Sequence, residues 1–158
     1  HCAFQADLHR DWGFLAAEPY LNGVAGLLAE VEERGLSNVR VHRGDALDVL
    51  ERLPDASLSA VYLLHPDPWP KARHAKRRFV HPEMLKLAAR VLKPGAEWRI
   101  ASDDPTYQAW VADVLAAQTL FDVPTPATTR PDGWPPTRYE AKALTAGRTP
   151  RYWTLRRR

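Results

Sequence analysis

Apolar and polar residues alternate between two periods along the chain, and this pattern predicts helices and strands in turn. Apolar residues recur at helical spacing from Tyr20 to Val31, and the clearest helical stripe runs from Tyr107 to Leu115. Short apolar or alternating runs lie between these stripes and predict strands. Further helices are predicted over residues 1–10, 45–53 and 79–93, and strands over residues 13–17, 39–43, 58–64, 97–101 and 152–155. The strands over residues 13–17 and 58–64 are expected to be buried, because their runs are apolar.

Turn-forming residues mark where these elements begin and end. Gly35 predicts the end of one helix, and Pro105 suits the first turn of another, with Asp104 as its cap. Residues 122–138 contain several prolines and little periodicity, which predicts a long loop. The alternation of strand and helix predicts an α/β fold, with a mainly parallel sheet covered by helices on both faces.

The composition narrows the class of protein. The 158 residues predict a single domain, and 45% hydrophobic and 26% charged residues are typical of a globular protein. No apolar run has the length of a membrane helix, and the first residues lack the features of a secretory signal. The single cysteine, Cys2, predicts no internal disulfide, so we expect a cytoplasmic protein without a metal cluster.

One stretch, residues 65–78, has an unusual composition and follows the strand predicted over residues 58–64. Prolines alternate with other residues at its start, which excludes a helix or a central strand there. A proline also disfavours helical geometry in the residue before it. The sequence therefore predicts that Asp67 and Trp69 lie on a stiff, extended loop at the carboxyl end of a strand.

A dense run of basic side chains follows this loop. A carboxylate and an aromatic ring beside positive charges suit a site that holds a nucleic-acid base and its phosphates. The alternative is an ordinary loop with solvated charges. Trp69 either stacks on a base or supports the loop, and we favour support. The basic residues are Lys71, Arg73, His74, Lys76, Arg77 and Arg78.

Acidic residues follow the predicted strands at Glu18, Asp45, Asp67 and Asp103. In a parallel sheet they would lie along the edge formed by the carboxyl ends of the strands, where ligands bind. An acid after the second strand of a nucleotide-binding sheet can accept hydrogen bonds from both ribose hydroxyls, a role that fits Glu18. Asp45 could accept from an adenine amino group or cap its helix, and Asp103 could be a ligand or only a turn residue.

Several common motifs are absent from the chain. There is no Gly-x-Gly-x-x-Gly pattern and no Walker-type phosphate loop, which argues against nucleotide hydrolysis. There is no CxxC motif or paired-histidine spacing, which argues against a metal site.

Residues 66–78 resemble the hallmark of the bacterial tRNA (guanine-N7)-methyltransferases. Residues 18–24 look like the ribose-binding strand end of that family, and residues 45–46 match its adenine-side acid. Residues 101–103 match its late aspartate, and residues 137–140 resemble its Thr-Lys-Phe-Glu signature. The resemblance covers essentially the whole chain, with an arginine and a tyrosine at the Lys and Phe positions.

This resemblance implies a Rossmann-like class I methyltransferase that transfers a methyl group from S-adenosylmethionine to N7 of a guanine in the tRNA variable loop. It implies that Glu18, Asp45 and Asp67 bind the cofactor, and that Asp67 is also the catalytic residue. The family's first strand and glycine-rich loop would precede His1, so residues 1–158 are expected to be an N-terminally incomplete methyltransferase domain. The implied substrate-binding residues are Lys71, Asp103, Thr137, Arg138, Tyr139 and Glu140, with Arg73, Lys76, Arg77 and Arg78 on the RNA backbone.

Two other functions stay open from the sequence. The chain could be a non-catalytic RNA-binding module on a methyltransferase fold, or a methyltransferase that acts on DNA or protein. The basic run favours a folded nucleic acid as the substrate over DNA or protein. The acidic residues that would face the cofactor and the base argue against a pure binding module, which would not need them. We expect tRNA as the partner, in a monomer or a homodimer, with no membrane and no metal.

Overall fold

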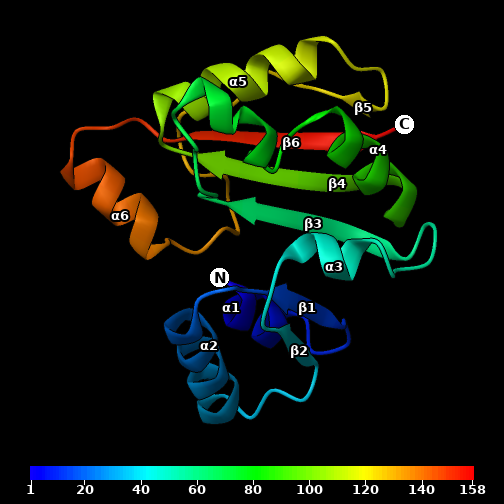
Figure 1. The fold of residues 1–158 in the computed structure, drawn as a ribbon. Coiled ribbons are helices and arrows are strands. Elements are labelled where there is room, and N and C mark those ends of the chain that lie inside the picture. The colour runs from blue at the N-terminus through cyan, green and yellow to red at the C-terminus, as the bar shows by residue number, and fades with distance from the viewer. The chain divides into compact units, whose positions relative to one another are not determined.

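The structure is a computed structural model that describes residues 1–158. The chain forms two compact units, residues 1–53 and residues 54–158, and each unit contains its own sheet (Figure 1). Strands and helices alternate in both, so the predicted α/β class is confirmed. None of the helices combines the length and the apolar character that crossing a membrane requires.

The first unit follows the predicted order of elements. These are α1 (Cys2–Leu8), β1 (Phe14–Ala17), α2 (Leu21–Glu33), β2 (Val39–His42) and α3 (Ala46–Leu50). The two strands are parallel. Gly35 lies just beyond α2 with a φ of +59°, a left-handed conformation that glycine adopts without steric cost, so the predicted helix end is confirmed.

Asn38, which directly precedes β2, is hydrogen-bonded to the start of the first unit. Its side-chain amide donates to the backbone carbonyls of Ala6, His9 and Trp12, at 3.0, 3.2 and 2.9 Å. Strand β1 was predicted to be buried, but its residues alternate between half-buried and exposed, because β1 pairs only with β2 in this sheet. The small buried core of the unit consists of Ala3, Ala6, Leu36 and Val39.

The second unit is built on a four-stranded mixed sheet. Its elements are β3 (Leu58–Leu64), the 3₁₀ helix η1 (Ala72–Arg77), α4 (Pro82–Val91), β4 (Leu92–Ser102), α5 (Pro105–Ala116), β5 (Phe121–Asp122), α6 (Arg138–Thr145) and β6 (Arg151–Arg157). The strand order is β3-β4-β6-β5. Strands β3 and β4 are parallel, as predicted, whereas β6 runs antiparallel to both β4 and β5. Helix α6 lies beyond the carboxyl ends of β3 and β4 (Figure 1).

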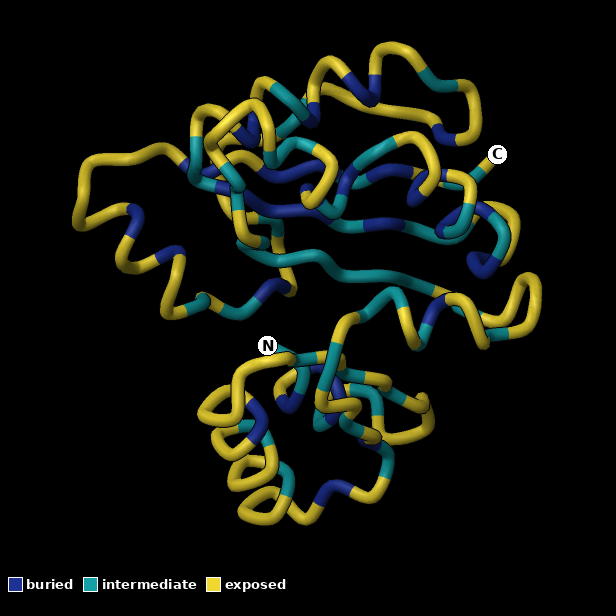
Figure 2. The backbone as a smooth tube through the Cα atoms, viewed as in Figure 1, coloured by how far each residue is buried: buried dark blue, intermediate teal, exposed yellow.

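Aromatic side chains pack on both faces of this sheet. Trp98 of β4 is fully buried and meets Phe79 and Phe121 edge-on, with ring centroids 6.3 and 5.9 Å apart. On the opposite face, Trp134 from the loop before α6 meets Tyr152 edge-on at 5.7 Å. Most of the buried strand residues belong to β4 and β6, whereas β3 at the sheet edge is only half-buried (Figure 2).

Some elements differ from the prediction for local reasons. Helix α4 begins at Pro82 rather than near Phe79, because proline suits a first helical position and keeps the residue before it extended. The helix also ends at Val91, before the predicted residue 93, and β4 begins at Leu92. The 3₁₀ helix and the two-residue strand β5 carry too little periodicity to be seen in the sequence. Helix α6 was also missed, although Thr137 and Glu140 form a capping box at its start.

Candidate active site

The first unit places Glu18 and Asp45 after its two parallel strands, at one edge of its sheet. Glu18 Oε1 accepts a hydrogen bond from the backbone N–H of Tyr20 at 2.9 Å, and Oε2 has no hydrogen bond within the protein. The same side chain lies against Gly23, where an added Cβ would be 2.7 Å from Glu18 Cδ. Asp45 is exposed and caps α3 by accepting from Leu47 N–H at 2.9 Å, so its predicted capping role is confirmed.

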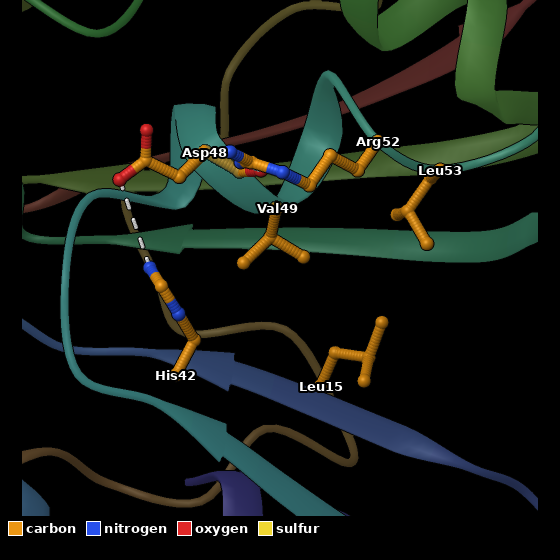
Figure 3. Close-up of a pocket in the computed structure, with 6 residues that line it drawn as sticks. All are labelled: Leu15, His42, Asp48, Val49, Arg52 and Leu53. Carbon is orange, nitrogen blue, oxygen red and sulfur yellow. Dashed lines mark hydrogen bonds and ion pairs between the residues drawn. The ribbon is translucent and has the colours of Figure 1, made fainter.

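A pocket of about 560 Å³ opens in the first unit between β1 and the α3 segment (Figure 3). It contains none of the predicted site residues. On one side of it, His42 Nε2 and the Asp48 carboxylate lie 3.7 Å apart. No group of three or more His, Cys, Asp or Glu side chains in the molecule is placed to hold a metal ion. The pocket is lined by Leu15, His42, Asp48, Val49, Arg52 and Leu53.

The proline-rich loop over residues 65–71 presents Asp67 to solvent. Its carboxylate forms no hydrogen bond or ion pair with the protein. The expectation of a uniformly extended loop is wrong at two positions: His65 and Trp69, each before a proline, have φ values of +50° and +43°. Left-handed backbone is unfavourable for residues that carry a Cβ, so neighbouring groups must hold this loop in place.

Trp69 is packed against the basic run that follows it. The Arg77 guanidinium lies over the indole, 4.8 Å from its centroid, and His74 meets the ring edge-on at 5.8 Å. These contacts agree with the interpretation that Trp69 packs within the loop and stabilises it, rather than stacking on a base. Four cations of this basic run are exposed, and none of them has a carboxylate within ion-pair distance. They are Lys71, Arg73, Lys76 and Arg77.

Arg78 does not belong to this exposed set. It was expected to bind the RNA backbone, but only 6% of the residue is exposed. Its guanidinium Nε donates to the carbonyl of Pro68 at 3.0 Å and to that of Trp69 at 3.3 Å, and Nη2 donates to Trp69 at 3.0 Å. A phosphate cannot reach a guanidinium that is buried and already donating to the backbone, so the predicted role of Arg78 is corrected.

Asp103, directly after β4, links two segments at the carboxyl end of the sheet. Its Oδ1 lies 2.9 Å from His65 Nδ1, and its Oδ2 accepts from Arg148 Nε at 2.6 Å. Burial raises the pKa of Asp103, but the hydrogen bonds and charges of these partners outweigh burial and lower it overall. His65 was missed although it opens the unusual stretch, and no pattern in the sequence marks Arg148. Asp103 is therefore more than a turn residue.

The start of α6 combines exposed and buried members of the predicted substrate set. Arg138 and Tyr139 are exposed, and the Tyr139 ring lies nearly parallel to that of His65 with centroids 6.2 Å apart. Thr137 accepts from the backbone N–H of Glu140 at 3.0 Å and so caps the helix.

Glu140 was expected to contact the guanine, but its side chain is only 7% exposed. Its Oε1 accepts from the Tyr152 hydroxyl at 2.8 Å, and Oε2 from Arg130 Nη1 at 3.0 Å. Burial raises the pKa of Glu140, but these hydrogen bonds outweigh it and lower the pKa overall. Because both oxygens are engaged, the structure gives Glu140 an internal role instead of a direct contact with substrate.

The chain is similar in sequence to known methyltransferases. A family model described as "Putative methyltransferase" matches residues 1–151. The tRNA (guanine-N(7)-)-methyltransferase of Granulibacter bethesdensis is 53% identical over 166 residues, which cover 100% of this chain and 73% of that protein. The protein of the same name from Erythrobacter litoralis is 48% identical over 164 residues, with coverages of 100% and 70%.

The fold is also found among solved structures. An rRNA methylase from Streptococcus thermophilus aligns with a TM-score of 0.57 at 14% sequence identity, covering 92% of this chain and 73% of that one. At this level of identity the likeness concerns the fold alone. It confirms the predicted Rossmann-like methyltransferase architecture.

Proposed function

We propose that this chain, which belongs to the tRNA (guanine-N7)-methyltransferase family, transfers a methyl group from S-adenosylmethionine to N7 of a guanine in tRNA. The observation that carries the proposal is Asp67, an exposed carboxylate without a protein partner, which is followed in the sequence by exposed cations that have no carboxylate partner. We further propose that the target guanine lies in the variable loop, that residues 1–158 belong to a single methyltransferase domain, and that the protein works in the cytoplasm.

The residues of the first unit fit the cofactor. S-adenosylmethionine supplies a methyl group that its sulfonium centre has already activated. Glu18 has one oxygen fixed by Tyr20 N–H and the other available to accept from ribose hydroxyls. Gly23 leaves the room that this carboxylate occupies. Asp45 is exposed and can accept from the adenine amino group while it caps α3.

Asp67 has the chemistry that methylation of guanine N7 requires. N7 already carries a lone pair, so no base is needed to create the nucleophile, and the protein must align the reacting groups. A carboxylate can accept hydrogen bonds from the N1 and N2 donors of guanine. Its negative charge also offsets the positive charge that develops on the base during the transfer.

The exposed cations fit the phosphates of tRNA. Arg73, Lys76 and Arg77 are assigned to the RNA backbone, and Lys71, which is closest in sequence to Asp67, to the substrate near the target base. We assign a second group of residues to the guanine side, because they follow β4 or lie at the start of α6, where the Tyr139 ring stacks with that of His65 after β3. This group consists of Asp103, Thr137, Arg138 and Tyr139. Arg78 and Glu140 are left out of this set because they are buried and paired.

A methylation assay with a modified tRNA tests the proposed reaction. The protein and radiolabelled S-adenosylmethionine should methylate a tRNA, and replacement of the target guanosine by 7-deazaguanosine should abolish the label, because a C–H group then occupies position 7. Tight tRNA binding without any methyl transfer would instead identify a non-catalytic RNA-binding module. Label that persists on the 7-deaza tRNA would exclude N7 as the acceptor.

Substituting Gly23 should separate cofactor binding from stability. Gly23→Ala forces the Glu18 side chain away, because the new Cβ would lie 2.7 Å from Glu18 Cγ and Cδ. Loss of the charge-assisted hydrogen bonds of Glu18 should weaken binding of S-adenosylmethionine roughly tenfold by calorimetry. Gly26→Ala in the same helix is the matched control, since a Cβ there meets nothing within 4 Å. Equal cofactor affinity in the two variants would remove Glu18 from the cofactor site.

The exposed cations should give salt-dependent tRNA binding. Replacing Lys76 and Arg77 together by alanine should reduce the slope of log affinity against log salt by about 1 per lost phosphate contact. Arg156→Ala is the control, because Arg156 is also exposed but lies 3.3 Å from the Glu97 carboxylate. A double variant whose salt slope equals that of the wild type would show that these two side chains do not meet phosphate.

A further inference from the structure

The basic run divides into side chains that face solvent and one that faces the protein. Arg77 is exposed, whereas its neighbour Arg78 is 6% exposed and donates to the carbonyls of Pro68 and Trp69. The Arg78 guanidinium carbon, Cζ, lies over the ring of Trp110 of α5, 4.9 Å from the ring centroid. Arg78 therefore joins the proline-rich loop to a helix of the second unit.

The loop segment held by Arg78 contains an unfavourable backbone conformation. Trp69 has a φ of +43° and precedes a proline, and its carbonyl accepts from both Nε and Nη2 of Arg78. Left-handed conformations of such residues persist only where surrounding groups hold them. Because the forked guanidinium donates to two consecutive carbonyls, it can fix the direction of this backbone segment.

Asp67 immediately precedes the first of these carbonyl residues, Pro68, and no protein group contacts its carboxylate. The direction of that carboxylate is therefore set by the backbone of the loop rather than by a side-chain partner. The anchor itself is fixed, because Trp110 Nε1 donates to the carbonyl of Val80 at 2.6 Å.

We infer that Arg78 is a positioning residue, whose guanidinium holds the carbonyls of Pro68 and Trp69 and thereby aims the Asp67 carboxylate at the guanine. This inference rests on the proposed function of Asp67. It divides the basic run into residues that bind tRNA, such as Arg77, and one that acts on the rate of methyl transfer without touching the substrate. A purely structural role would affect stability without a selective effect on the rate.

The test compares Arg78→Lys with the matched control Arg156→Lys, at an exposed arginine outside the proposed site. Lysine keeps the charge but lacks the planar fork, so the loop should lose its two-carbonyl anchor. Because a misplacement of about 1 Å can cost on the order of a hundredfold in rate, kcat of Arg78→Lys should fall at least tenfold. Its KM for tRNA and the salt slope of tRNA binding should stay at the wild-type values. Arg156→Lys should keep a kcat within about twofold of the wild type, since Arg156 is an exposed arginine outside the proposed site and lysine retains its charge.

Several results would overturn the inference. They are a wild-type kcat for Arg78→Lys, a reduced salt slope that indicates lost phosphate contact, or loss of the folded state in thermal melts of both Arg78→Lys and Arg78→Gln. Added guanidinium ion should partly restore the rate of Arg78→Ala, and it should not affect Arg77→Ala. Failure of this rescue would also count against the positioning role.

A double variant separates this inference from the proposed function. If Asp67→Asn alone has the wild-type rate, the proposed function of Asp67 fails whatever Arg78 does. If Asp67→Asn is slow and Arg78→Lys lowers the rate by the same factor in that background, the two residues act independently and only the inference fails. If Arg78 acts through the carboxylate, Arg78→Lys should add little to the effect of Asp67→Asn.

Discussion

Asp67→Asn is expected to lower the rate of tRNA methylation by roughly a hundredfold while leaving tRNA affinity nearly unchanged. Asparagine preserves the size of the side chain and one acceptor oxygen. It removes the negative charge that offsets the cationic base, and it presents an N–H₂ group where the guanine N1 and N2 donors need an acceptor. The effect should therefore fall on the transition state, in which the positive charge develops, more than on the bound substrate.

Single-turnover methylation at saturating S-adenosylmethionine measures this effect directly, because product release does not limit the observed rate. Asp113→Asn is the control, since Asp113 is an exposed aspartate on α5 that is not part of the proposed site. A wild-type single-turnover rate for Asp67→Asn would leave Asp67 as an ordinary loop residue. A loss of tRNA affinity with an unchanged rate would make it a binding residue only.

Glu140→Gln is expected to lower the free energy of unfolding by about 2 kcal/mol, the magnitude of a buried hydrogen bond to a charged group. Glu140 accepts from Tyr152 and Arg130 and completes the capping box with Thr137. Glutamine can replace one acceptor, but its amide N–H₂ group then faces another donor. Urea unfolding measures the loss, with Glu83→Gln on the surface of α4 as a control that should change little.

The same carboxylate predicts how stability depends on pH. The pKa of Glu140 is lowered in the folded protein from its ordinary value of 4.5. Its stabilising contribution is therefore complete above about pH 4.5, the value of the unfolded chain, and is lost as the pH falls through the folded pKa. In unfolding experiments between about pH 6 and pH 3, Glu140→Gln should lose less stability on acidification than the wild type. Parallel pH profiles would contradict this role of Glu140.

Elements with a long periodic stripe could be predicted because their signal is local. The stripe of α5 with Pro105 at its start, and the cap provided by Asp104, follow from the sequence alone. The antiparallel direction of β6 could not be predicted, because strand direction depends on which neighbours the strand meets in the folded sheet. Strands β1 and β3 were predicted as buried from their apolar runs, but each lies at the edge of its own sheet.

The exposure of Asp67 and of most of the basic residues agrees with the prediction, whereas the contacts of several other site residues could not be predicted. Asp67 and the cations after it are exposed, as a site for nucleic acid requires. The sequence could not show that Arg78 turns inward, because its partner Trp110 lies on a helix far along the chain. The same holds for Glu140, whose burial depends on Arg130 and Tyr152. Composition alone does not distinguish an exposed charge from a buried one.

The position of β6 has a consequence for synthesis of the protein on the ribosome. Strand β6 lies between β4 and β5 in the sheet, although both precede it in the sequence. While a nascent chain lacks residues 151–157, the inner edge of β4 therefore exposes unpaired backbone groups. At about 5–20 residues per second, this interval lasts several seconds after β4 has been made. Because open strand edges template pairing between chains, this edge of β4 is a site for pairing with another chain until β6 has been made.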